Sequence, residues 1–314
     1  MSTYVFLASS AYSGSTLLSY LLGAHPAIAT VSAASGGRRQ SRIDEYRCSC
    51  GRLLTECPFW DAVRQEMLRR GYSDFDLAHF HLGFDIAPGS RRERLRTGSL
   101  RWNLLESARD LALDRLAGRG RAMRAVGRRN ADFAEAVMGL SQASVYVDAS
   151  KERMRIRHLR RYLPMPLKVI HLVRDVRGVA TSALHHASAA RDGAESAART
   201  WAATNRTILR HLDELPERDH TTVRYEDLCR DPAAALERLY AFCGVDPARA
   251  RDPLGDVAEQ HLLGNRRRLG AWTEIRLDER WRTELPVAEQ ERALELGGAV
   301  QRRLYPEGRP QPLT

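Results

Sequence analysis

Short apolar runs alternate with helical patterns along the chain. Residues 4–8 form a continuous apolar run, which is typical of a strand buried inside a parallel sheet. A polar turn over residues 9–14 follows, and leucines then recur at the spacing of one helix face, at Leu17, Leu18, Leu21 and Leu22. Gly23 and Pro26 are residue types that end helices. The chain is therefore predicted to begin with a strand, a loop and a helix.

The same alternation continues in the second half of the chain. Further strands are predicted at residues 145–147, 167–173 and 221–225. Helices are predicted after the second and third of these, and the last helix has Asp231 as its N-cap and is closed by Gly244. Strands that alternate with helices indicate a parallel sheet, in which ligands bind at the carboxyl ends of the strands.

The alternation of strand and helix patterns is interrupted between about residues 60 and 140. Residues 90–129 are rich in arginine with interspersed leucines, which predicts amphipathic helices that are inserted into the α/β core or lie over it. We therefore predict a single α/β domain over residues 1–314, with a mostly helical insertion at about 60–140.

The chain carries more basic than acidic residues. Lys and Arg number 49 and Asp and Glu number 39, so the net charge is +10. Such an excess favours anionic partners such as nucleotides, sulfate, nucleic acid, acidic membranes or acidic glycans, although a basic surface that serves only solubility has the same charge. No apolar stretch has the length of a signal peptide core or a membrane span. With five cysteines, the chain is expected to be cytoplasmic and to keep its thiols reduced.

The predicted turn into the first helix has the composition of an anion site. At the start of a helix, backbone N–H groups lack partners and the helix dipole adds positive charge. Gly14 allows the backbone to approach a ligand, and Ser13, Ser15 and Thr16 add hydroxyl donors. An ordinary serine-capped helix start would show the same residues. The first glycine and the lysine of a Walker A loop are missing, which counts against a nucleoside-triphosphate kinase or an ATPase.

Several segments along the chain together resemble a known family. In chain order they are S-G-S-T-L-L at 13–18, C-S-C-G at 48–51, C-P-F-W at 57–60, R-D-V-R-G at 174–178 with Ser182, Y-E-D-L at 225–228 and G-N-R-R-R at 264–268. This set resembles sulfotransferases that use 3′-phosphoadenosine 5′-phosphosulfate (PAPS), in their bacterial and carbohydrate-type branch. The resemblance implies a P-loop-like three-layer sandwich with a central parallel sheet. It also implies in-line transfer of a sulfuryl group to a hydroxyl or an amine of a small-molecule, glycan or lipid acceptor.

The resemblance also assigns residues to the two anionic ends of PAPS. The 5′-phosphosulfate is expected on a five-residue loop, Ser13, Gly14, Ser15, Thr16 and Leu17. The 3′-phosphate is expected at Arg174, Ser182, Arg267 and Arg268, because a planar guanidinium fork suits a phosphate dianion and a hydroxyl completes it. Asn265 is expected to shape the loop that carries Arg267 and Arg268. Tyr225 is expected near the adenine. The alternatives are that Arg174 pairs with Asp175 at a helix start and that Tyr225 is a core residue.

The reaction needs a cation, because transfer builds negative charge on the oxygen that leaves with the nucleotide. Many members of the family carry Lys or Arg directly before the S-G pair, where this chain has Tyr12. Lys151 follows a short predicted strand, and we predict it as the catalytic cation because lysine is scarce in this arginine-rich chain. An ordinary surface lysine is the alternative. No base is assigned, since Ala33 stands at the position of the usual glutamate and Asp44 and Glu45 are merely nearby carboxylates.

Three cysteines lie within ten residues, at Cys48, Cys50 and Cys57. A C-x-C-x6-C set with a fourth ligand could bind zinc. Paired C-x2-C knuckles are absent, so the sequence favours thiols that are buried and pack locally. We therefore predict PAPS as the cosubstrate, with 3′-phosphoadenosine 5′-phosphate as product, and no metal.

Three other interpretations remain open. The chain could bind PAPS as a regulatory module without catalysis, since no carboxylate stands at Ala33. It could be a small-molecule kinase of P-loop type, which the missing Walker lysine disfavours. It could bind nucleic acid through its arginines, but aromatic residues between them are lacking, so we predict no nucleic-acid partner. The sequence leaves the acceptor open and is compatible with a homodimer.

Overall fold

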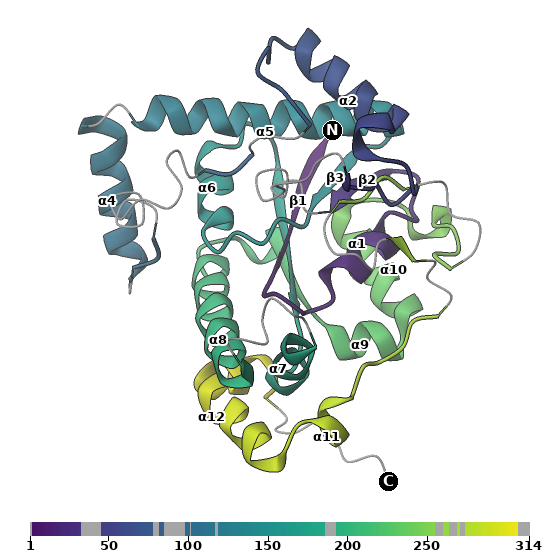
Figure 1. Ribbon diagram of the computed structural model, residues 1–314. Helices are drawn as coiled ribbons and strands as arrows, with labels where there is room; N and C mark the ends of the chain where they lie inside the picture. Colours follow the sequence, from purple (N-terminus) through teal and green to yellow (C-terminus); the bar gives the residue numbers. More distant parts are fainter. Residues whose placement is uncertain are drawn as a thin grey trace.

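A five-stranded parallel sheet forms the centre of the protein (Figure 1). The computed structural model describes residues 2–32, 45–77, 82–84, 98–100, 102–116, 119–185, 193–254, 260–263, 269–270 and 274–306. The strands are β1 (Thr3–Ser9), β2 (Ile28–Ser32), β3 (Val145–Asp148), β4 (Leu167–Val173) and β5 (His220–Arg224). Their order is β2-β3-β1-β4-β5, and every neighbouring pair is parallel. The first strand is therefore central, and its carboxyl end lies between those of β3 and β4.

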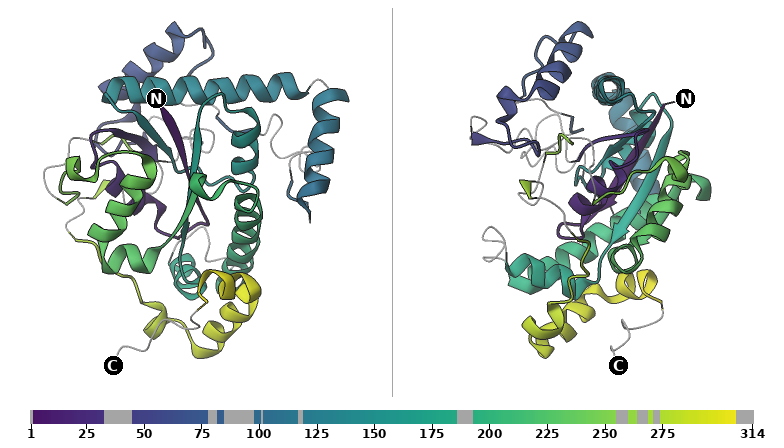
Figure 2. Two further views of the ribbon diagram at one scale, coloured as in Figure 1. Left: turned by 180° about the vertical axis from the view of Figure 1, so that it is seen from behind. Right: turned by 90° about the vertical axis from the view of Figure 1, so that its right-hand side faces the viewer.

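Helices cover both faces of the sheet (Figure 2). One face carries α1 (Ser15–Leu22), α9 (Tyr225–Arg230) and α10 (Pro232–Cys243). The other carries α5 (Arg119–Ser141), α6 (Arg155–Tyr162) and α8 (Gly193–Leu212), and α5 is in contact with α2 (Pro58–Arg69) and α4 (Asn103–Leu116). A further apolar cluster joins α8 to α7 (Val176–Leu184), α11 (Trp281–Glu284) and α12 (Val287–Leu304). Short 3₁₀ helices occupy Leu54–Glu56, Glu217–Asp219 and Pro247–Arg249.

The central strand β1 is buried on both faces, as its continuous apolar run predicts. Tyr4, Phe6 and Ala8 belong to the apolar core that also contains residues of α2 and α5. Val5 and Leu7 belong to the core on the side of α1 and α10. Successive side chains of a strand point to opposite faces, so one apolar run supplies both cores. The predicted α/β architecture with a central parallel sheet is confirmed.

The predicted strands are present with small shifts. β4 has the predicted bounds, and β1 is one residue longer at each end. Tyr225, predicted as the last residue of a strand, instead begins α9, because β5 ends at Arg224. β2 was not predicted, and its short run becomes a strand by pairing with β3. The single-domain organisation over residues 1–314 remains a prediction. None of the helices within the described ranges combines the length and apolar character that crossing a membrane requires.

The arginine-rich insertion is helical where it is described, and ion pairs fasten it to the core. Three carboxylates of α4 lie one helical turn apart and face basic side chains of α6 and α8: Glu106 faces Arg210 and His211, Asp110 faces Arg157, and Asp114 faces Arg161. Glu106 is fully buried, and its Oε2 lies 3.0 Å from Nε2 of His211. Arg157 and Arg210 are therefore engaged in ion pairs with buried carboxylates, and Arg161 pairs nearer the surface.

Replacing Glu106 with glutamine should remove a contribution to stability that depends on pH. Burial alone would raise the pKa of Glu106, but hydrogen bonds from His211 and from the N–H of Leu100 hold it at about 2. A carboxylate with a lowered pKa stabilises the fold above its unfolded pKa, and this stabilisation is lost as the pH falls through its folded pKa. We expect the free energy of unfolding of the wild type to exceed that of Glu106→Gln by roughly 3 kcal/mol at pH 7.

The difference between the two proteins should then shrink as the pH falls from about 4.5 toward 2. Urea unfolding at a series of pH values measures it, because urea does not screen charges. A difference that stays constant over this range would show that the Glu106 carboxylate is not stabilised in the folded protein.

Candidate functional site

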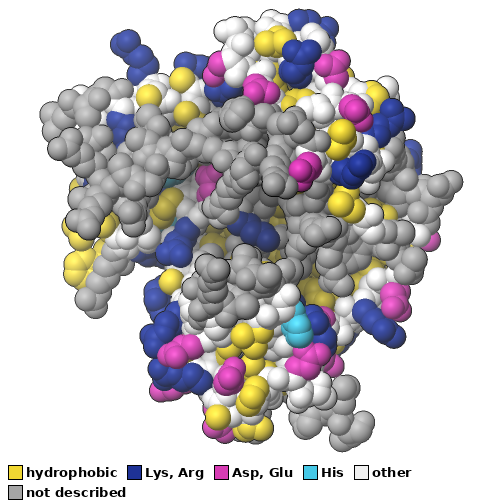
Figure 3. All heavy atoms as spheres, in the orientation of Figure 1, with side chains coloured by type: hydrophobic (Ala, Val, Ile, Leu, Met, Phe, Trp, Pro, Cys, Tyr) yellow, Lys and Arg dark blue, Asp and Glu magenta, His cyan; other side chains and the backbone are white. Residues whose placement is uncertain are grey.

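The carboxyl ends of three strands bring the predicted site segments together. Residues 10–14 join β1 to α1, Lys151 follows β3, and Arg174 follows β4 directly. Because β3 and β4 are the two strands that pair with β1, these segments converge at one edge of the sheet. Lys and Arg side chains are also visible near the middle of the face shown in Figure 3. With Lys151 and Arg174, the edge of the sheet has the position and the charge that suit an anionic ligand.

The loop after β1 has a backbone conformation that suits an anion. Tyr12 has a φ of 62° and Gly14 a φ of 90°, both in the left-handed region, whereas Ser13 between them has a negative φ. Backbone of alternating hand turns successive N–H groups toward one side. The first turn of α1, which begins at Ser15, adds N–H groups without acceptors inside the helix and the positive end of its dipole. The loop can therefore hold a phosphate or sulfate group.

Gly14 is required by space as well as by conformation. A Cβ atom at this position would lie 2.6 Å from Cδ2 of Tyr225, which is far inside ordinary contact distance. The OH of Tyr225 donates to the carbonyl of Arg276 at 3.2 Å, and the guanidinium of Arg174 lies 4.6 Å from the ring centroid. The ring is only 5% exposed and supports both the loop and Arg174. Contact between Tyr225 and adenine remains a prediction.

Arg174 and Ser182, the predicted 3′-phosphate pair, lie together. Nη1 of Arg174 donates to Oγ of Ser182 at 3.0 Å and to the carbonyl of Tyr12 at 3.2 Å. This contact joins the loop after β1 to α7. Asp175, the alternative partner of Arg174, instead caps α7 and forms an ion pair with Arg177 at 2.9 Å. Arg177 is buried in this pair and therefore has a structural role.

A carboxylate that the sequence did not reveal faces Arg174. Oδ2 of Asp278 lies 3.1 Å from Nη2 of Arg174, and the same Nη2 donates to the carbonyl of Asp278 at 2.9 Å. Burial alone would raise the pKa of Asp278, but the hydrogen bond from Arg280 and the charge of Arg174 hold it well below its ordinary range. The Asp278 carboxylate thus lies beside the guanidinium that the sequence predicts as a phosphate ligand. No local signal marks it, because the contact spans 104 residues of sequence.

The serine hydroxyls of the loop are less accessible than the sequence suggests. Ser13 is fully buried, and its Oγ lies 2.7 Å from Oγ of Ser10. Ser15 is also buried, and the side chain of Leu17 packs in the core beside α10. Thr16 remains half-buried. The backbone N–H groups and the hydroxyl of Thr16 are therefore the groups that this loop offers to an anion.

Lys151 follows β3 at the same edge. It is exposed, yet nearby protein atoms partly desolvate its ammonium group and lower its pKa. A buried network holds the backbone just before it. Oδ2 of Asp148 accepts from Nε of Arg155 at 2.6 Å and from the OH of Tyr4 at 2.7 Å, while Oδ1 accepts from the N–H of Ser150 at 2.9 Å. The chain thus presents Lys151 from a fixed position.

Tyr12 takes the place where the resembling family carries a cation. Its side chain packs against the apolar cluster around α7, α8 and α12, and it lines a groove of about 260 Å³ together with Trp201. Trp201 is fully buried, and its Nε1 donates to the carbonyl of Arg174 at 3.0 Å. A tyrosine with a positive φ is uncommon and costs conformational energy, so its surroundings hold the loop in this form.

Some of the predicted residues lie outside the described part of the chain. They are Asn265, Arg267 and Arg268 of the predicted 3′-phosphate segment, and Ala33 and Asp44 of the region considered for the base. Leu263, directly before the first group, donates its N–H to the carbonyl of Val31 at 2.9 Å. Leu263 therefore lies beside the carboxyl end of β2, and the roles of the residues that follow it remain predictions.

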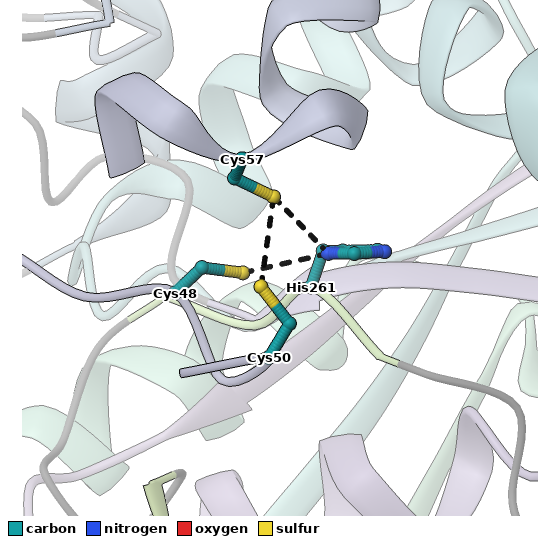
Figure 4. Close-up of side chains that lie close together, drawn as sticks. All are labelled: Cys48, Cys50, Cys57 and His261. Carbon is teal, nitrogen blue, oxygen red and sulfur yellow. Dashed lines mark hydrogen bonds between the residues drawn. The ribbon is translucent and has the colours of Figure 1, made fainter. Parts of the chain in front are cut away.

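Three thiols come together with a histidine from a distant part of the chain (Figure 4). Sγ of Cys48 and Sγ of Cys57 lie 3.5 and 3.3 Å from Nδ1 of His261, and Sγ of Cys50 lies 3.7 Å from Sγ of Cys57. Burial raises the pKa of Cys48 to about 12 and also raises that of Cys57. As free thiols they are therefore protonated and weak nucleophiles. The sequence did not reveal His261, which lies 213 residues after Cys48.

Comparisons with known proteins agree with this geometry. Residues 101–249 match the model of the sulfotransferase family. Carbohydrate sulfotransferase 5 from Mus musculus is 32% identical over 162 residues, a match that covers 43% of this chain and only 40% of the length of that relative. The family model and this relative support the assignment of the chain to the sulfotransferase family.

Two solved structures share the fold. The sulfotransferase domain of the Synechococcus PCC 7002 olefin synthase is 22% identical, with a TM-score of 0.51 over 99% of this chain and 96% of that chain. The sulfotransferase domain from the curacin biosynthetic pathway is 16% identical, with a TM-score of 0.51 over 94% of this chain and 97% of that chain. Both support the α/β fold described above.

Proposed function

We propose that this protein is a sulfotransferase that moves the sulfuryl group of PAPS to a hydroxyl or an amine of a small-molecule, glycan or lipid acceptor. The observation that carries the proposal is the position of Arg174 between the loop after β1 and α7. Its guanidinium contacts the carbonyl of Tyr12 on the loop after β1 and the hydroxyl of Ser182 on α7. PAPS carries anionic groups at both ends, so it requires two anion-binding sites at one edge of the sheet.

Each end of PAPS has a matching group of residues. The N–H groups of Ser15, Thr16 and Leu17 at the start of α1, with the preceding turn, would hold the 5′-phosphosulfate. Arg174 and Ser182 would hold the 3′-phosphate, joined by residues of the segment 264–268. Asp278 would then share the Arg174 guanidinium with the phosphate or move away from it, because two anions compete for one set of donors.

The transfer step follows from the chemistry of PAPS. The acceptor oxygen or nitrogen attacks sulfur in line with the bond to the 5′-phosphate oxygen. That S–O bond breaks, 3′-phosphoadenosine 5′-phosphate leaves with the electron pair, and the proton of the acceptor passes to a base or to water. Negative charge develops on the leaving oxygen, and a cation beside it stabilises the transition state. We assign this role to Lys151.

Thermal unfolding in the presence of nucleotides tests the class of donor. At a concentration of about 100 times its Kd, 3′,5′-ADP should add roughly 2.7 kcal/mol to the free energy of unfolding. ATP at the same concentration should add less, because it lacks the 3′-phosphate that Arg174 and Ser182 would bind. Equal or greater stabilisation by ATP would point to a kinase instead. Incubation with PAPS and a panel of glycans, phenols and lipid alcohols, followed by mass spectrometry for an added sulfuryl group, tests transfer.

A second function, a PAPS-binding module without catalysis, is favoured by one observation. The side chain of Tyr12 stands where the resembling family carries a cation and packs against an apolar cluster, so it brings no charge to the leaving oxygen. Both proposals expect 3′,5′-ADP to bind. Binding without transfer to any acceptor of the panel would favour the module.

A further inference from the structure

Four side chains with metal-binding atoms, none of them assigned to the proposed donor site, surround one point. Sγ of Cys48, Cys50 and Cys57 and the nearer ring nitrogen of His261 all lie within 4.8 Å of one another. They come from the turn at residues 48–51, the N-cap of α2 and the segment 260–263. Figure 4 shows the three sulfur atoms and the ring nitrogen pointing toward a common centre.

Three of the six separations among the ligand atoms match the edges of a tetrahedron around a zinc ion, and all six are within 4.8 Å. With Zn–S bonds of about 2.3 Å and a Zn–N bond of about 2.0 Å, tetrahedral angles place two sulfurs about 3.8 Å apart and a sulfur about 3.5 Å from the nitrogen. The structure has 3.7 Å between Cys50 and Cys57, and 3.5 and 3.3 Å from Cys48 and Cys57 to His261. A disulfide would bring two sulfurs to about 2.05 Å and would leave the third thiol and the imidazole outside the bond.

Hydrogen bonds of the backbone hold the first two cysteines in place. The N–H of Cys48 donates to the carbonyl of Arg52 at 3.0 Å, and the N–H of Gly51 donates to the carbonyl of Cys48 at 2.9 Å. Gly51 has a φ of 85°, a conformation that a glycine adopts without strain. The hydroxyl of Ser49 accepts the N–H of Leu262 at 2.7 Å. This turn is therefore tied directly to the segment that carries the histidine.

The other two ligands are also oriented before any ion binds. The ring of Phe59 stacks on that of His261 at a centroid distance of 4.4 Å and an interplanar angle of 4°, which fixes the direction of Nδ1. Cys57 is the N-cap of α2, so the start of this helix fixes the position of its sulfur. The four ligand atoms are thus held by contacts among the turn, α2 and the segment 260–263.

We propose that Cys48, Cys50, Cys57 and His261 bind a structural zinc ion. Three thiolates and one imidazole in a tetrahedral arrangement are the ligands that zinc prefers. Four protein ligands leave no position for water or substrate, so the ion would hold the fold and take no part in sulfuryl transfer. Its binding releases the three thiol protons to solvent. This proposal replaces the sequence-based expectation of no metal, which lacked the fourth ligand.

The ion would link two parts of the chain that are far apart in sequence. Cys57 and His261 are separated by 204 residues, and closing a long loop costs conformational entropy that a metal link offsets. The link would join α2 to the segment 260–263, which also contacts β2 through Leu263 and Val31. Removal of the ion should therefore lower the melting temperature of the whole protein.

Metal analysis of the purified chain tests the site. The protein is produced in a zinc-supplemented culture and purified without a metal-affinity column or chelator. Elemental analysis by inductively coupled plasma mass spectrometry should then find one zinc ion per chain. Cys50→Ser and His261→Ala should lose nearly all of it. Cys229→Ser and Cys243→Ser replace buried free thiols outside the cluster and should keep it.

Two measurements on the wild type separate loss of the site from loss of the fold. A mercurial reagent that titrates the thiols should release one zinc ion, detected by a coloured chelator. Protein with cobalt in place of zinc should show thiolate-to-metal charge transfer and the strong visible absorption of a tetrahedral site. Folded protein without metal, a disulfide between Cys50 and Cys57, or iron in place of zinc would overturn the proposal. None of these readouts involves PAPS, so they are independent of the proposed function.

Discussion

Lys151→Ala should lower the turnover number roughly 100- to 1,000-fold, as expected for the loss of one group that stabilises charge in a transition state. The affinity for 3′,5′-ADP should change little, because this charge develops on the leaving oxygen only as the S–O bond breaks. Steady-state sulfation rates and calorimetric titration with 3′,5′-ADP measure the two quantities. Unchanged turnover in Lys151→Ala would remove this residue from the mechanism.

Lys168 supplies a matched control, since it is the only other lysine of the chain. Its Nζ donates to the carbonyl of Phe242 and lies 5.1 Å from that ring, so Lys168→Ala should keep its turnover even if its stability falls. The pH profile adds a second readout. Desolvation lowers the pKa of Lys151, so turnover should fall with rising pH at a pH below the ordinary lysine value of about 10.4. Lys151→Arg should not show this loss.

Arg174→Ala should weaken the binding of 3′,5′-ADP roughly 10- to 150-fold, the equivalent of about 1.5–3 kcal/mol for hydrogen bonds to a charged group. Two effects act in the same direction. The 3′-phosphate loses its guanidinium, and the loop loses the bond from Nη1 of Arg174 to the carbonyl of Tyr12. Binding of 5′-AMP, which lacks the 3′-phosphate, should weaken less. Calorimetric titration with both nucleotides measures the difference.

Arg177→Ala is the control for the stability cost of deleting a buried arginine. Arg177 pairs with Asp175, and its guanidinium lies 3.8 Å from the ring centroid of Trp281. Its loss should lower the free energy of unfolding without a comparable loss of 3′,5′-ADP affinity. If both variants lose affinity to the same extent, the effect of Arg174→Ala is structural and the 3′-phosphate assignment is wrong.

Some of the candidate site could be predicted because its signals are local. The apolar run of β1, the glycine at position 14 and the leucines of α1 occupy one short stretch, and local backbone geometry decides what such a stretch forms. Arg174 and Ser182 were also assigned to one site, on the resemblance to a family, and the structure places them within hydrogen-bond distance. The contact of Tyr225 with Gly14 was not, since Tyr225 was placed at the end of a strand and the structure places it in α9.

The thiol cluster and Asp278 also combine residues that the sequence points to with residues that only the structure brings to the site. Three cysteines within ten residues were visible in the sequence, but the fourth ligand lies on the segment 260–263. Asp278 reaches Arg174 from the C-terminal segment across 104 residues. Both contacts form because segments that are distant in sequence lie at the same edge of the sheet. A pattern of neighbouring residues does not predict which distant segments come together there.

The sequence by itself determined the class of fold, the glycine-containing turn after the first strand and the arginine that follows the strand at residues 167–173. These features depend on apolar periodicity and on residues close together in the chain. The tertiary structure alone decided the strand order, which places β1 between the strands that lead to Lys151 and Arg174. It also decided that His261 joins the three thiols. Packing between distant segments sets these contacts. They are stabilised by burying apolar surface between helices and strands that lie far apart in the sequence, so a local residue pattern does not predict them.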